Sequence, residues 1–287
     1  EGANSDDVAI AAVGGFGRGE LSPGSDLDIL ILHRGTLSEE ALASFVNKIL
    51  YPLWDRNIKV DHSVRTRSEV RDAAEADLKV ILGLLDIRLV CGSAALVADV
   101  QIDALDEWRK NSKRRLAELE RSLLERHQRS GELAYLLEPD LKEARGGLRD
   151  ITAIRALEKS GAIAIPMERI SVAESLLSNV REALHIVSGR DKDKLLFHEQ
   201  DKVAAHLGFE DADILMSEVA QAARSVDYLL DSTWYRIAHK GKDSSGRFLR
   251  KVRSTTISRD ISVANKEVTI DTDADFSLDP TIGLRAC

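Results

Sequence analysis

The segment that most constrains the fold is VAIAAVGGFGRGELSPGSDLDILIL, which covers residues 8–32. It joins two apolar runs through a glycine-rich turn, and Asp26 and Asp28 stand at the start of the second run. Short apolar runs bounded by turn residues are typical of buried strands. Side chains at positions i and i+2 of a strand point to the same face. The carboxylates of Asp26 and Asp28 are therefore predicted to converge, while Leu27 and Ile29 point into the core.

The glycine-rich turn matches neither of two common phosphate-binding loops. A dinucleotide-binding fingerprint needs a third glycine at its sixth position, where this chain has Glu20 or Ser22. A Walker loop needs Lys followed by Ser or Thr after its last glycine, but Glu20 and Leu21 follow Gly19 and the carboxylate would repel phosphate. The turn is instead interpreted as a strand end that opens a short helix.

Two neighbouring carboxylates repel each other unless a cation lies between them. Mg²⁺ is the predicted cation, because it binds a few carboxylates and fills its other positions with substrate phosphate and water. Such a site can align an in-line attack on a phosphoryl group. In this interpretation Gly14 and Gly15 let backbone N–H groups approach the phosphates of a nucleotide, and Arg18 adds positive charge.

The chain divides into three regions by pattern. Over residues 8–100, β-branched runs alternate with helical stretches, including a helix over 39–54, which indicates an α/β unit. Over residues 102–240, apolar residues recur at three- and four-residue spacing, which predicts a helical bundle. The segment EPDLKEARGGLRD at 138–150 interrupts it, because its proline and glycines disfavour a helix interior. After residue 253 the alternating pattern predicts a hairpin.

Composition argues against several classes of protein. No apolar run approaches the roughly 18 residues of a membrane helix and no signal-peptide pattern is present, so we expect a cytoplasmic protein without a membrane partner. The cysteines, Cys91 and Cys287, do not suggest a disulfide framework or a cysteine metal site. The net charge of -8 argues against a broad nucleic-acid surface. Core or surface roles are expected for histidines that lack metal-ligand spacing, namely His62, His185, His198 and His206.

Four motifs carry a resemblance to a known family. VGG at 13–15, followed after ten residues by DLD at 26–28, resembles the DNA polymerase β-like nucleotidyltransferase superfamily. The longer text GGFGRGELSPGSDLDILIL is similar, more narrowly, to the bifunctional PII uridylyltransferase/uridylyl-removing enzymes and the actinobacterial PII adenylyltransferases. Three further stretches resemble the same family, namely LWDRNIKVDHSVRT (53–66), LLEPDLKEARGGLRDI (136–151) and SGRDKDKLLFHEQDKVAAHLGF (188–209). The resemblance therefore covers most of the chain.

The resemblance implies an α+β fold in three parts. A polymerase β-like nucleotidyltransferase domain with a mixed sheet and helices, truncated at its N-terminus, is expected over residues 1–100. An all-α domain that closes one side of the nucleotide cleft is expected over 101–253, and a β-rich tail over 254–287. Full-length members continue into a hydrolase domain marked by a His-Asp dipeptide and into small-molecule-sensing domains. This sequence contains no His-Asp dipeptide, and its ends look like cuts in a longer chain. We therefore expect a fragment without the hydrolase, whose tail connects to that domain.

The implied activity is the transfer of UMP or AMP from UTP or ATP to a tyrosine hydroxyl of a PII-type signalling protein. Pyrophosphate is released, Mg²⁺ or Mn²⁺ takes part, and the reaction serves nitrogen regulation. One alternative is a nucleotidyltransferase that acts on RNA ends or on a small molecule, against which the acidic charge and the three further motifs count. Another is a degenerate nucleotide-sensing module, against which the intact Asp26, Asp28 and Arg18 count.

Asp61 is the candidate for the third carboxylate that polymerase β-like sites usually place on a neighbouring strand. In IKVDHSVRT, strand alternation puts Lys59, Asp61 and Ser63 on one face, so Asp61 could face the cleft as a metal ligand and general base. The competing interpretation is an exposed aspartate paired with Lys59 or Arg65. The candidate catalytic and metal-binding residues are Asp26, Asp28 and Asp61.

Residues around the glycine turn and in the segment 138–150 are the candidate nucleotide contacts. The resemblance implies that this segment belongs beside the cleft. An alternative is that its charged residues only pair with neighbouring helices. The candidates are Gly14, Gly15, Gly17, Arg18, Glu20, Ser25, Glu138, Lys142, Gly146, Gly147, Arg149 and Asp150.

Overall fold

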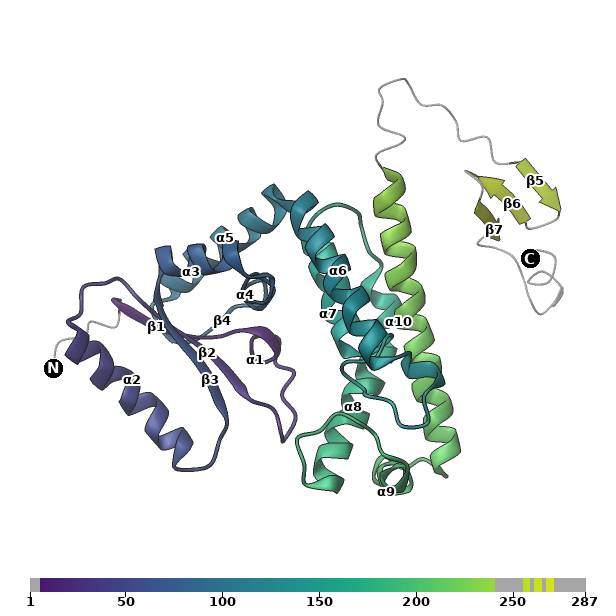
Figure 1. Ribbon diagram of the computed structural model, residues 1–287, viewed down its shortest axis with the longest axis horizontal. Helices are drawn as coiled ribbons and strands as arrows, with labels where there is room; N and C mark the ends of the chain where they lie inside the picture. Colours follow the sequence, from purple (N-terminus) through teal and green to yellow (C-terminus); the bar gives the residue numbers. More distant parts are fainter. Residues whose placement is uncertain (1–5, 241–254, 259–260, 265–266, 271–287) are drawn as a thin grey trace. The chain divides into compact units, whose positions relative to one another are not determined.

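The computed structural model describes residues 6–240, 255–258, 261–264 and 267–270, and Figure 1 shows their elements. The contacts divide the chain into two units, Glu1–Ile237 and Ala238–Cys287. The first unit contains a mixed sheet with helices, followed by further helices, so the α+β fold expected from the sequence is confirmed. The domain boundaries expected after residues 100 and 253 stay predictions. Helix α5 (Ala94–Lys110) runs across the first of them without a break.

A four-stranded sheet with the order β3-β2-β1-β4 organises the N-terminal part of the first unit. Strand β1 (Val8–Ala12) is antiparallel to both β2 (Leu27–His33) and β4 (Arg88–Gly92), and β3 (Val60–Thr66) is parallel to β2. The glycine turn between β1 and β2 forms the short helix α1 (Gly14–Arg18). The strands and the short helix predicted around the glycine turn are thus present.

Helices lie on both sides of the sheet (Figure 1). Helix α2 (Glu39–Trp54), which has the bounds predicted from the sequence, lies on one side. Helices α3 (Arg67–Ala76), α4 (Leu78–Leu84) and α5 belong to the other side. A capping box, in which the Thr66 and Glu69 side chains bond each other's backbone N–H, starts α3 directly at the end of β3.

Alternation along β2 determines where the acidic side chains point. Leu30 and Leu32 belong to the core shared with α4 and α5, whereas the buried Ile29 and Ile31 point to the opposite face. Of the two residues expected in the core, Ile29 is buried and Leu27 only half-buried. Because Asp28 precedes Leu30 by two positions, its carboxylate points to the α4 and α5 side, at the start of the strand.

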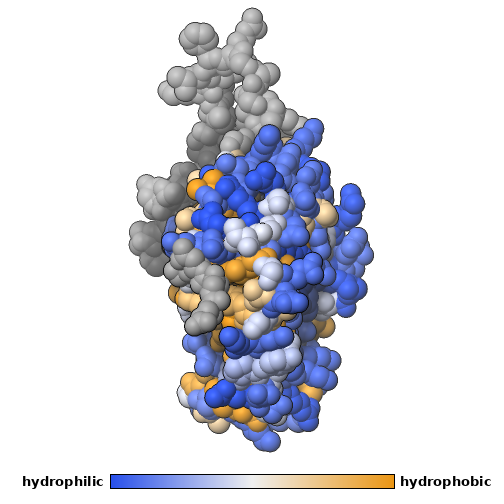
Figure 2. Space-filling view, turned by 90° about the vertical axis from the view of Figure 1, so that its left-hand side faces the viewer, coloured by the Kyte–Doolittle hydropathy of each residue, from blue (hydrophilic) through white to orange (hydrophobic). Residues whose placement is uncertain are grey.

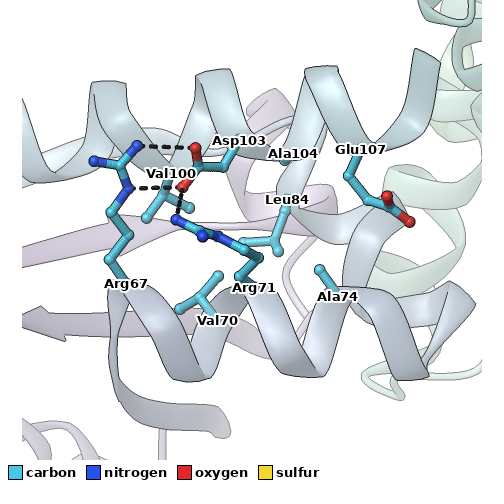
Figure 3. Close-up of a pocket in the computed structure, with 9 residues that line it drawn as sticks. All are labelled: Arg67, Val70, Arg71, Ala74, Leu84, Val100, Asp103, Ala104 and Glu107. Carbon is cyan, nitrogen blue, oxygen red and sulfur yellow. Dashed lines mark hydrogen bonds and ion pairs between the residues drawn. The ribbon is translucent and has the colours of Figure 1, made fainter. Parts of the chain in front are cut away.

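Helices α3 and α5 are tied together by ion pairs (Figure 3). Arg67 donates through Nε and Nη2 to the carboxylate of Asp103 at 2.6 and 2.8 Å, and Arg71 donates to the same carboxylate at 3.3 Å. The cavity beside these side chains has a volume of only about 10 Å³. This is room for at most one water molecule, so the cavity is a packing defect and not a ligand site.

The second half of the first unit is helical. Its buried apolar residues recur at helical spacing and join the same core as the sheet, which confirms the helical interpretation of this region. Two short 3₁₀ turns, Leu133–Tyr135 and Met167–Ile170, accompany the helices. The helices are α6 (Ser112–Ser130), α7 (Leu148–Lys159), α8 (Ser171–Ser188), α9 (Phe197–Leu207) and α10 (Ala212–Lys240).

The second unit contains a small antiparallel sheet with the order β5-β6-β7. Its strands are β5 (Thr255–Ser258), β6 (Ile261–Ala264) and β7 (Glu267–Ile270). The hairpin expected after residue 253 is therefore extended by a third strand. Its alternating sequence explains the strands, because alternation is the pattern of a sheet.

The surface is mainly hydrophilic on the face shown in Figure 2, with a smaller hydrophobic area near its middle. None of the helices in the described part of the chain combines the length and the hydropathy that a membrane span requires. Most large apolar side chains instead lie in the interior of the first unit.

A buried tryptophan joins the sheet part to the helical part. Trp108 of α5 is fully buried, and its indole N–H donates to the Ala156 carbonyl of α7 at 2.8 Å. We expect Trp108→Phe to lower the free energy of unfolding by about 2 to 3 kcal/mol, because it removes the donor and leaves a space. Urea denaturation measures this, and Trp54→Phe, at a side chain 41% exposed, is the control with an expected change within about 0.5 kcal/mol. Equal losses of unfolding free energy in both variants would contradict the role of Trp108 in joining the two parts.

Candidate active site

A cleft of about 710 Å³ lies between the sheet and the helical part of the first unit. One wall consists of α1, the loop over residues 19–26 and the start of β2. Helices α4, α6, α7 and α8, the segment before α7 and the loop after α8 supply the other lining residues. The volume lies in the range of roughly 300 to 1,000 Å³ that is usual for small-molecule sites. The cleft contains the glycine turn and the Asp-x-Asp motif, so it is the candidate active site.

Asp28 is the centre of the acidic group in this cleft. Asp26 and Asp28 both line the cleft. Asp61 of β3 is not among the lining residues, but it stands directly beside Asp28 in the parallel register. Residues in register on neighbouring strands point to the same face, so Asp61 faces the same side as Asp28. Burial raises the pKa of Asp28, and the negative charges of Asp61 and Asp26 raise it further, against the opposing effects of Lys142 and Arg18.

The acidic side chains fit a divalent metal by their chemistry. In the part of the chain that the structure describes, no three His, Cys, Asp or Glu side chains are arranged as a ready metal site, so three converging carboxyl groups are not seen. Carboxylate oxygens are nevertheless the ligands that Mg²⁺ and Mn²⁺ prefer. A divalent ion would also offset the repulsion that raises the pKa of Asp28. The role of Asp61 as a ligand stays a prediction.

The glycines of the turn have different surroundings. Gly14 has a positive φ of 56°, and a Cβ added there would lie 3.1 Å from Oδ2 of Asp28. Gly14 and Gly15 both line the cleft. A Cβ added at Gly17 would instead overlap the carbonyl oxygen of Asp86, outside the cleft. Gly17, predicted as a nucleotide contact, thus lets α1 pack closely against the turn before β4.

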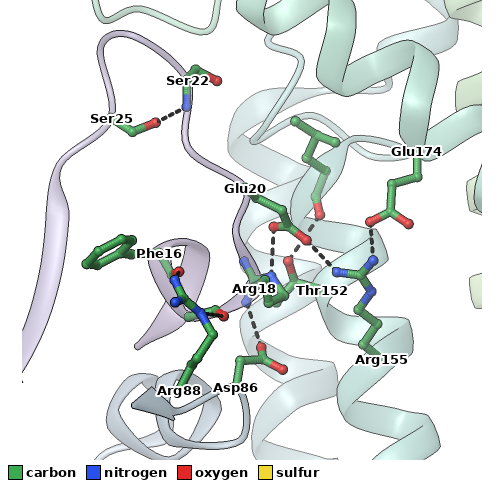
Figure 4. Close-up of polar contacts among 12 residues, drawn as sticks. Phe16, Arg18, Glu20, Ser22, Ser25, Asp86, Arg88, Thr152, Arg155 and Glu174 are labelled. Carbon is green, nitrogen blue, oxygen red and sulfur yellow. Dashed lines mark hydrogen bonds and ion pairs between the residues drawn. The ribbon is translucent and has the colours of Figure 1, made fainter. Parts of the chain in front are cut away.

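The side chains of Arg18 and Glu20 line the cleft but are engaged in ion pairs (Figure 4). Arg18 donates through Nη1 to Oδ2 of Asp86 and through Nε to Oε2 of Glu20, each at 2.7 Å. Glu20 also accepts from Arg155 of α7. Burial lowers the pKa of Arg18, but Glu20 and Asp86 raise it by more. These contacts connect the glycine turn to the helical part.

Two of the predicted residues in the segment 138–150 face the cleft. Lys142 and Arg149 line it, and Arg149 lies in the first turn of α7. Arg149 forms an ion pair with Glu143 at 2.9 Å, and Lys142 lies 4.0 Å from Asp193. Their positive charges therefore share one cleft with Asp26 and Asp28.

The other predicted residues of this segment hold the helices together and do not line the cleft. Glu138 accepts from the backbone N–H of Phe197 at 3.1 Å, at the start of α9. A Cβ added at Gly146 would lie 2.6 Å from the Ala223 carbonyl oxygen of α10, and one added at Gly147 would meet backbone of its own loop. For these residues the structure favours the interhelical alternative.

Asp150 also has a structural environment. It is fully buried in the first turn of α7, accepts from Arg126, and accepts from the Gly146 N–H at 2.6 Å. The His127 ring nitrogen lies 2.9 Å from its Oδ1. Burial would raise the pKa of Asp150, but His127 and Arg126 hold it below its ordinary value. Asp150 thus stays charged and fixes the loop to α6.

Some residues of the cleft were not identified from the sequence. Lys79 of α4 lines the cleft without an ion pair to any described residue, and it lies one turn before Gly83, whose added Cβ would be 3.8 Å from the Gly14 nitrogen. Arg181 of α8 donates to Ser22 Oγ at 2.7 Å and to Asp193 at 2.6 Å. The segments that carry Lys79 and Arg181 have the pattern of ordinary helices, and no local signal marks them.

Ser25 and the histidines complete the predicted set. Ser25 lines the cleft, and its hydroxyl accepts from the Ser22 N–H at 3.0 Å, which shapes the loop. His185 is buried, with Nε2 2.9 Å from Oδ1 of Asp193. The other histidines named in the sequence analysis, His62, His198 and His206, are exposed.

Comparisons with known proteins give one match that contains the glycine turn and α4 and another that contains the lining residues of α6, α7 and α8. Residues 2–85 match the model of a nucleotidyltransferase domain, and residues 110–162 and 166–234 match that of GlnD PII-uridylyltransferase. A bifunctional uridylyltransferase/uridylyl-removing enzyme of Streptomyces coelicolor is 48% identical over 84% of this chain. Proteins of the same name from Mycobacterium tuberculosis and Pseudomonas putida are 34% and 36% identical over 99% and 71% of it. The chain spans only 29%, 36% and 24% of the lengths of these three relatives.

The first prediction from the site concerns Gly17. We expect Gly17→Ala to lower the free energy of unfolding by about 3 kcal/mol, because the new methyl group overlaps backbone. Gly19→Ala is the control: nothing lies within 4 Å of its added Cβ, and its positive φ of 78° costs about 1 kcal/mol. Urea denaturation measures both variants. A Gly17→Ala variant of normal stability but weakened nucleotide binding would restore the role as a nucleotide contact.

The second prediction concerns the pH dependence of stability at Asp28. Its folded pKa lies above the ordinary 3.8, so the folded chain takes up this proton at a higher pH than the unfolded chain. The stability contributed by Asp28 therefore rises as the pH falls through the folded pKa to about 3.8. Without metal at pH 7, we expect Asp28→Asn to raise the unfolding temperature, and the difference from the parent chain to shrink at pH 4. A lower unfolding temperature at pH 7 would contradict this.

Proposed function

Because the chain belongs to the family of bifunctional uridylyltransferase/uridylyl-removing enzymes, we propose that its cleft transfers a nucleoside monophosphate from a nucleoside triphosphate to a PII-type signalling protein. Pyrophosphate is the second product, and the reaction serves nitrogen regulation in the cytoplasm. UTP is the favoured donor, since the relatives are named for uridylyl transfer, and ATP is the alternative. One observation carries the proposal: the cleft combines the carboxylates of Asp26 and Asp28 with the cations of Lys142 and Arg149.

The triphosphate is proposed to lie between these two sets of charges. Lys142 and Arg149 supply positive charge from the later helical part, and Lys79 of α4 supplies it from beside the glycine turn. Gly14 and Gly15 carry no side chain that would keep the phosphates from the backbone N–H groups of the turn. Phosphate oxygens would thus be bound from both walls, which orients the α-phosphorus for attack.

Asp26 and Asp28, with Asp61 as the third candidate, would hold Mg²⁺ or Mn²⁺. When bound, the ion supplies positive charge that stabilises the transferring phosphoryl group and the leaving pyrophosphate. The parallel register supports the inclusion of Asp61, because it stands beside Asp28 on the same face.

Asp61 is also the proposed general base. It is exposed, so the hydroxyl of a protein acceptor can reach it. In the proposed step Asp61 takes the proton of the tyrosine hydroxyl, and the oxygen attacks the α-phosphorus in line. A bond from the tyrosine oxygen to phosphorus forms, the bond from the α-phosphorus to the bridging oxygen breaks, and pyrophosphate leaves.

The direct test measures pyrophosphate release by the 287-residue chain with each of the four nucleoside triphosphates and Mg²⁺, with and without a PII protein. Release that requires both the PII protein and UTP or ATP is the expected result. Release with an RNA or small-molecule acceptor but not with the PII protein would overturn the proposed acceptor. No release under any of these conditions would overturn the transferase itself.

Substitutions of the acidic residues test their roles. We expect Asp26→Asn and Asp28→Asn to reduce transfer by about 100-fold or more with the fold retained, because charge stabilisation at the phosphoryl group is lost. Asp61→Ala should bind UTP normally and transfer it about 100-fold more slowly, because the proton acceptor is missing. Asp72→Asn, at an exposed aspartate of α3, is the control with unchanged rate. Wild-type rates in the Asp26 and Asp28 variants would rule out their proposed role.

A further inference from the structure

A chain of alternating charges links the glycine turn to α7 and α8. Arg18 is its centre and bonds the carboxylates of both Asp86 and Glu20 at 2.7 Å. On one side Asp86 also accepts from Lys159, and on the other side Glu20 also accepts from Arg155. Arg155 also forms an ion pair with Glu174 of α8, with a nitrogen–oxygen distance of 2.5 Å. We call Lys159, Asp86, Arg18, Glu20, Arg155 and Glu174 the ion-pair bridge, and Figure 4 shows its part from Asp86 to Glu174.

The bridge holds α7 at two points. Arg155 and Lys159 are four positions apart on α7, so they lie one above the other on the same side of the helix. Thr152, three positions before Arg155, lies on this side and lines the cleft. Two contacts along one helix restrict both its rotation and its sliding along its axis. The placement of the cleft residues of α7 is thus tied to the glycine turn.

The centre of the bridge is shielded from solvent. The side chains of Arg18 and Asp86 are 14% and 10% exposed, whereas those of Arg71 and Asp103 in a surface pair are 60% and 24% exposed. In a shielded pair, removal of one partner leaves an uncompensated charge, so the pairing is strongly specified. Asp86, Arg155, Lys159 and Glu174 are not among the residues that line the cleft. The bridge therefore starts at the cleft with Arg18 and Glu20, and its other members lie behind the cleft wall.

We infer that Arg18 and Glu20 are positioning residues that act through Arg155 and Lys159. They set the distance of α7, and of Arg149 in its first turn, from Asp26 and Asp28. In this inference the role replaces the direct nucleotide contact predicted from the sequence, because the guanidinium of Arg18 and the carboxylate of Glu20 already bond each other and other members of the bridge. The inference rests on the proposed function, since it concerns the alignment of that same cleft.

A double-mutant cycle tests the inference. The variants are Glu20→Gln, Arg155→Met and the two combined, and kcat/KM for UTP is measured with the PII protein at a temperature where circular dichroism shows every variant folded. We expect each single variant to lose about 10- to 100-fold, as a small misplacement of catalytic groups would cause. The combined variant should lose no more kcat/KM than the more impaired of the two single variants, because the two residues act through one contact.

Two further variants separate positioning from other roles. Arg155→Lys keeps the charge and should recover most of the lost rate. Arg169→Met, at an exposed arginine without an ion pair to any described residue, should keep the parent rate. The inference would be overturned if the fold-loss in the combined variant equalled the product of the losses in Glu20→Gln and Arg155→Met. A parent rate in Arg155→Met would overturn it as well. If the parent chain transfers nothing, the proposed function fails on its own. The same cycle in UTP affinity by calorimetry then decides the inference, with coupled losses supporting it and independent losses overturning it.

Discussion

The repulsion between carboxylates at one end of the sheet is the constraint to which the rest of the first unit is adapted. Strand pairing enforces it: the register between β2 and β3 sets Asp61 beside Asp28. Asp26 directly precedes β2 and lines the cleft together with Asp28. The effect is visible in the raised pKa of Asp28, to which burial and both neighbouring acids contribute. A fold selected only for stability would not gather these charges, so their position agrees with a site that recruits cations.

Contacts on two sides of the cleft keep the helical wall in place across from this acidic group. On one side the ion-pair bridge holds α7. On the other, Arg181 of α8 bonds Ser22 of the loop 19–26, and Gly24 packs so closely on Asp191 that an added Cβ would lie 2.6 Å from its Cα. Both contacts involve the segment between β1 and β2. The glycine-rich segment therefore organises the cleft through its own contacts as well as through any contact with phosphate.

The extent to which the sequence predicted the site follows from how local each role is. Asp26, Asp28 and Gly14 could be identified because strand alternation and a tight turn act over a few positions. Arg18 and Glu20 were predicted as nucleotide contacts, and the sequence could not show their ion pairs because Arg155, which bonds Glu20, lies 135 positions away. Periodicity likewise predicted the helices, but not which of their cations enter the cleft.

The segment 138–150 shows the same limit. Its residue types fit equally well with nucleotide binding and with helix packing, and in the structure some of them line the cleft while others pack between helices. Lys142 and Arg149 enter the cleft, while Gly146 is required by the close approach of Ala223, which is far away in the sequence. Residues that are adjacent in this motif therefore have different roles. Only the packing of α10 and α6 around the segment shows which residue has which role.

The cleft belongs to neither matched family segment alone. The nucleotidyltransferase match ends at residue 85 and contains the carboxylates, whereas the PII-uridylyltransferase match begins at residue 110 and contains Lys142 and Arg149. Between them α5 carries Trp108, which bonds α7 directly. The chemistry shared by the wider superfamily thus lies on one wall and the features particular to this family on the other. In the proposed reaction, discrimination among nucleotides and acceptors would therefore depend on the helical wall, and the bridge would make that wall part of the same catalytic unit.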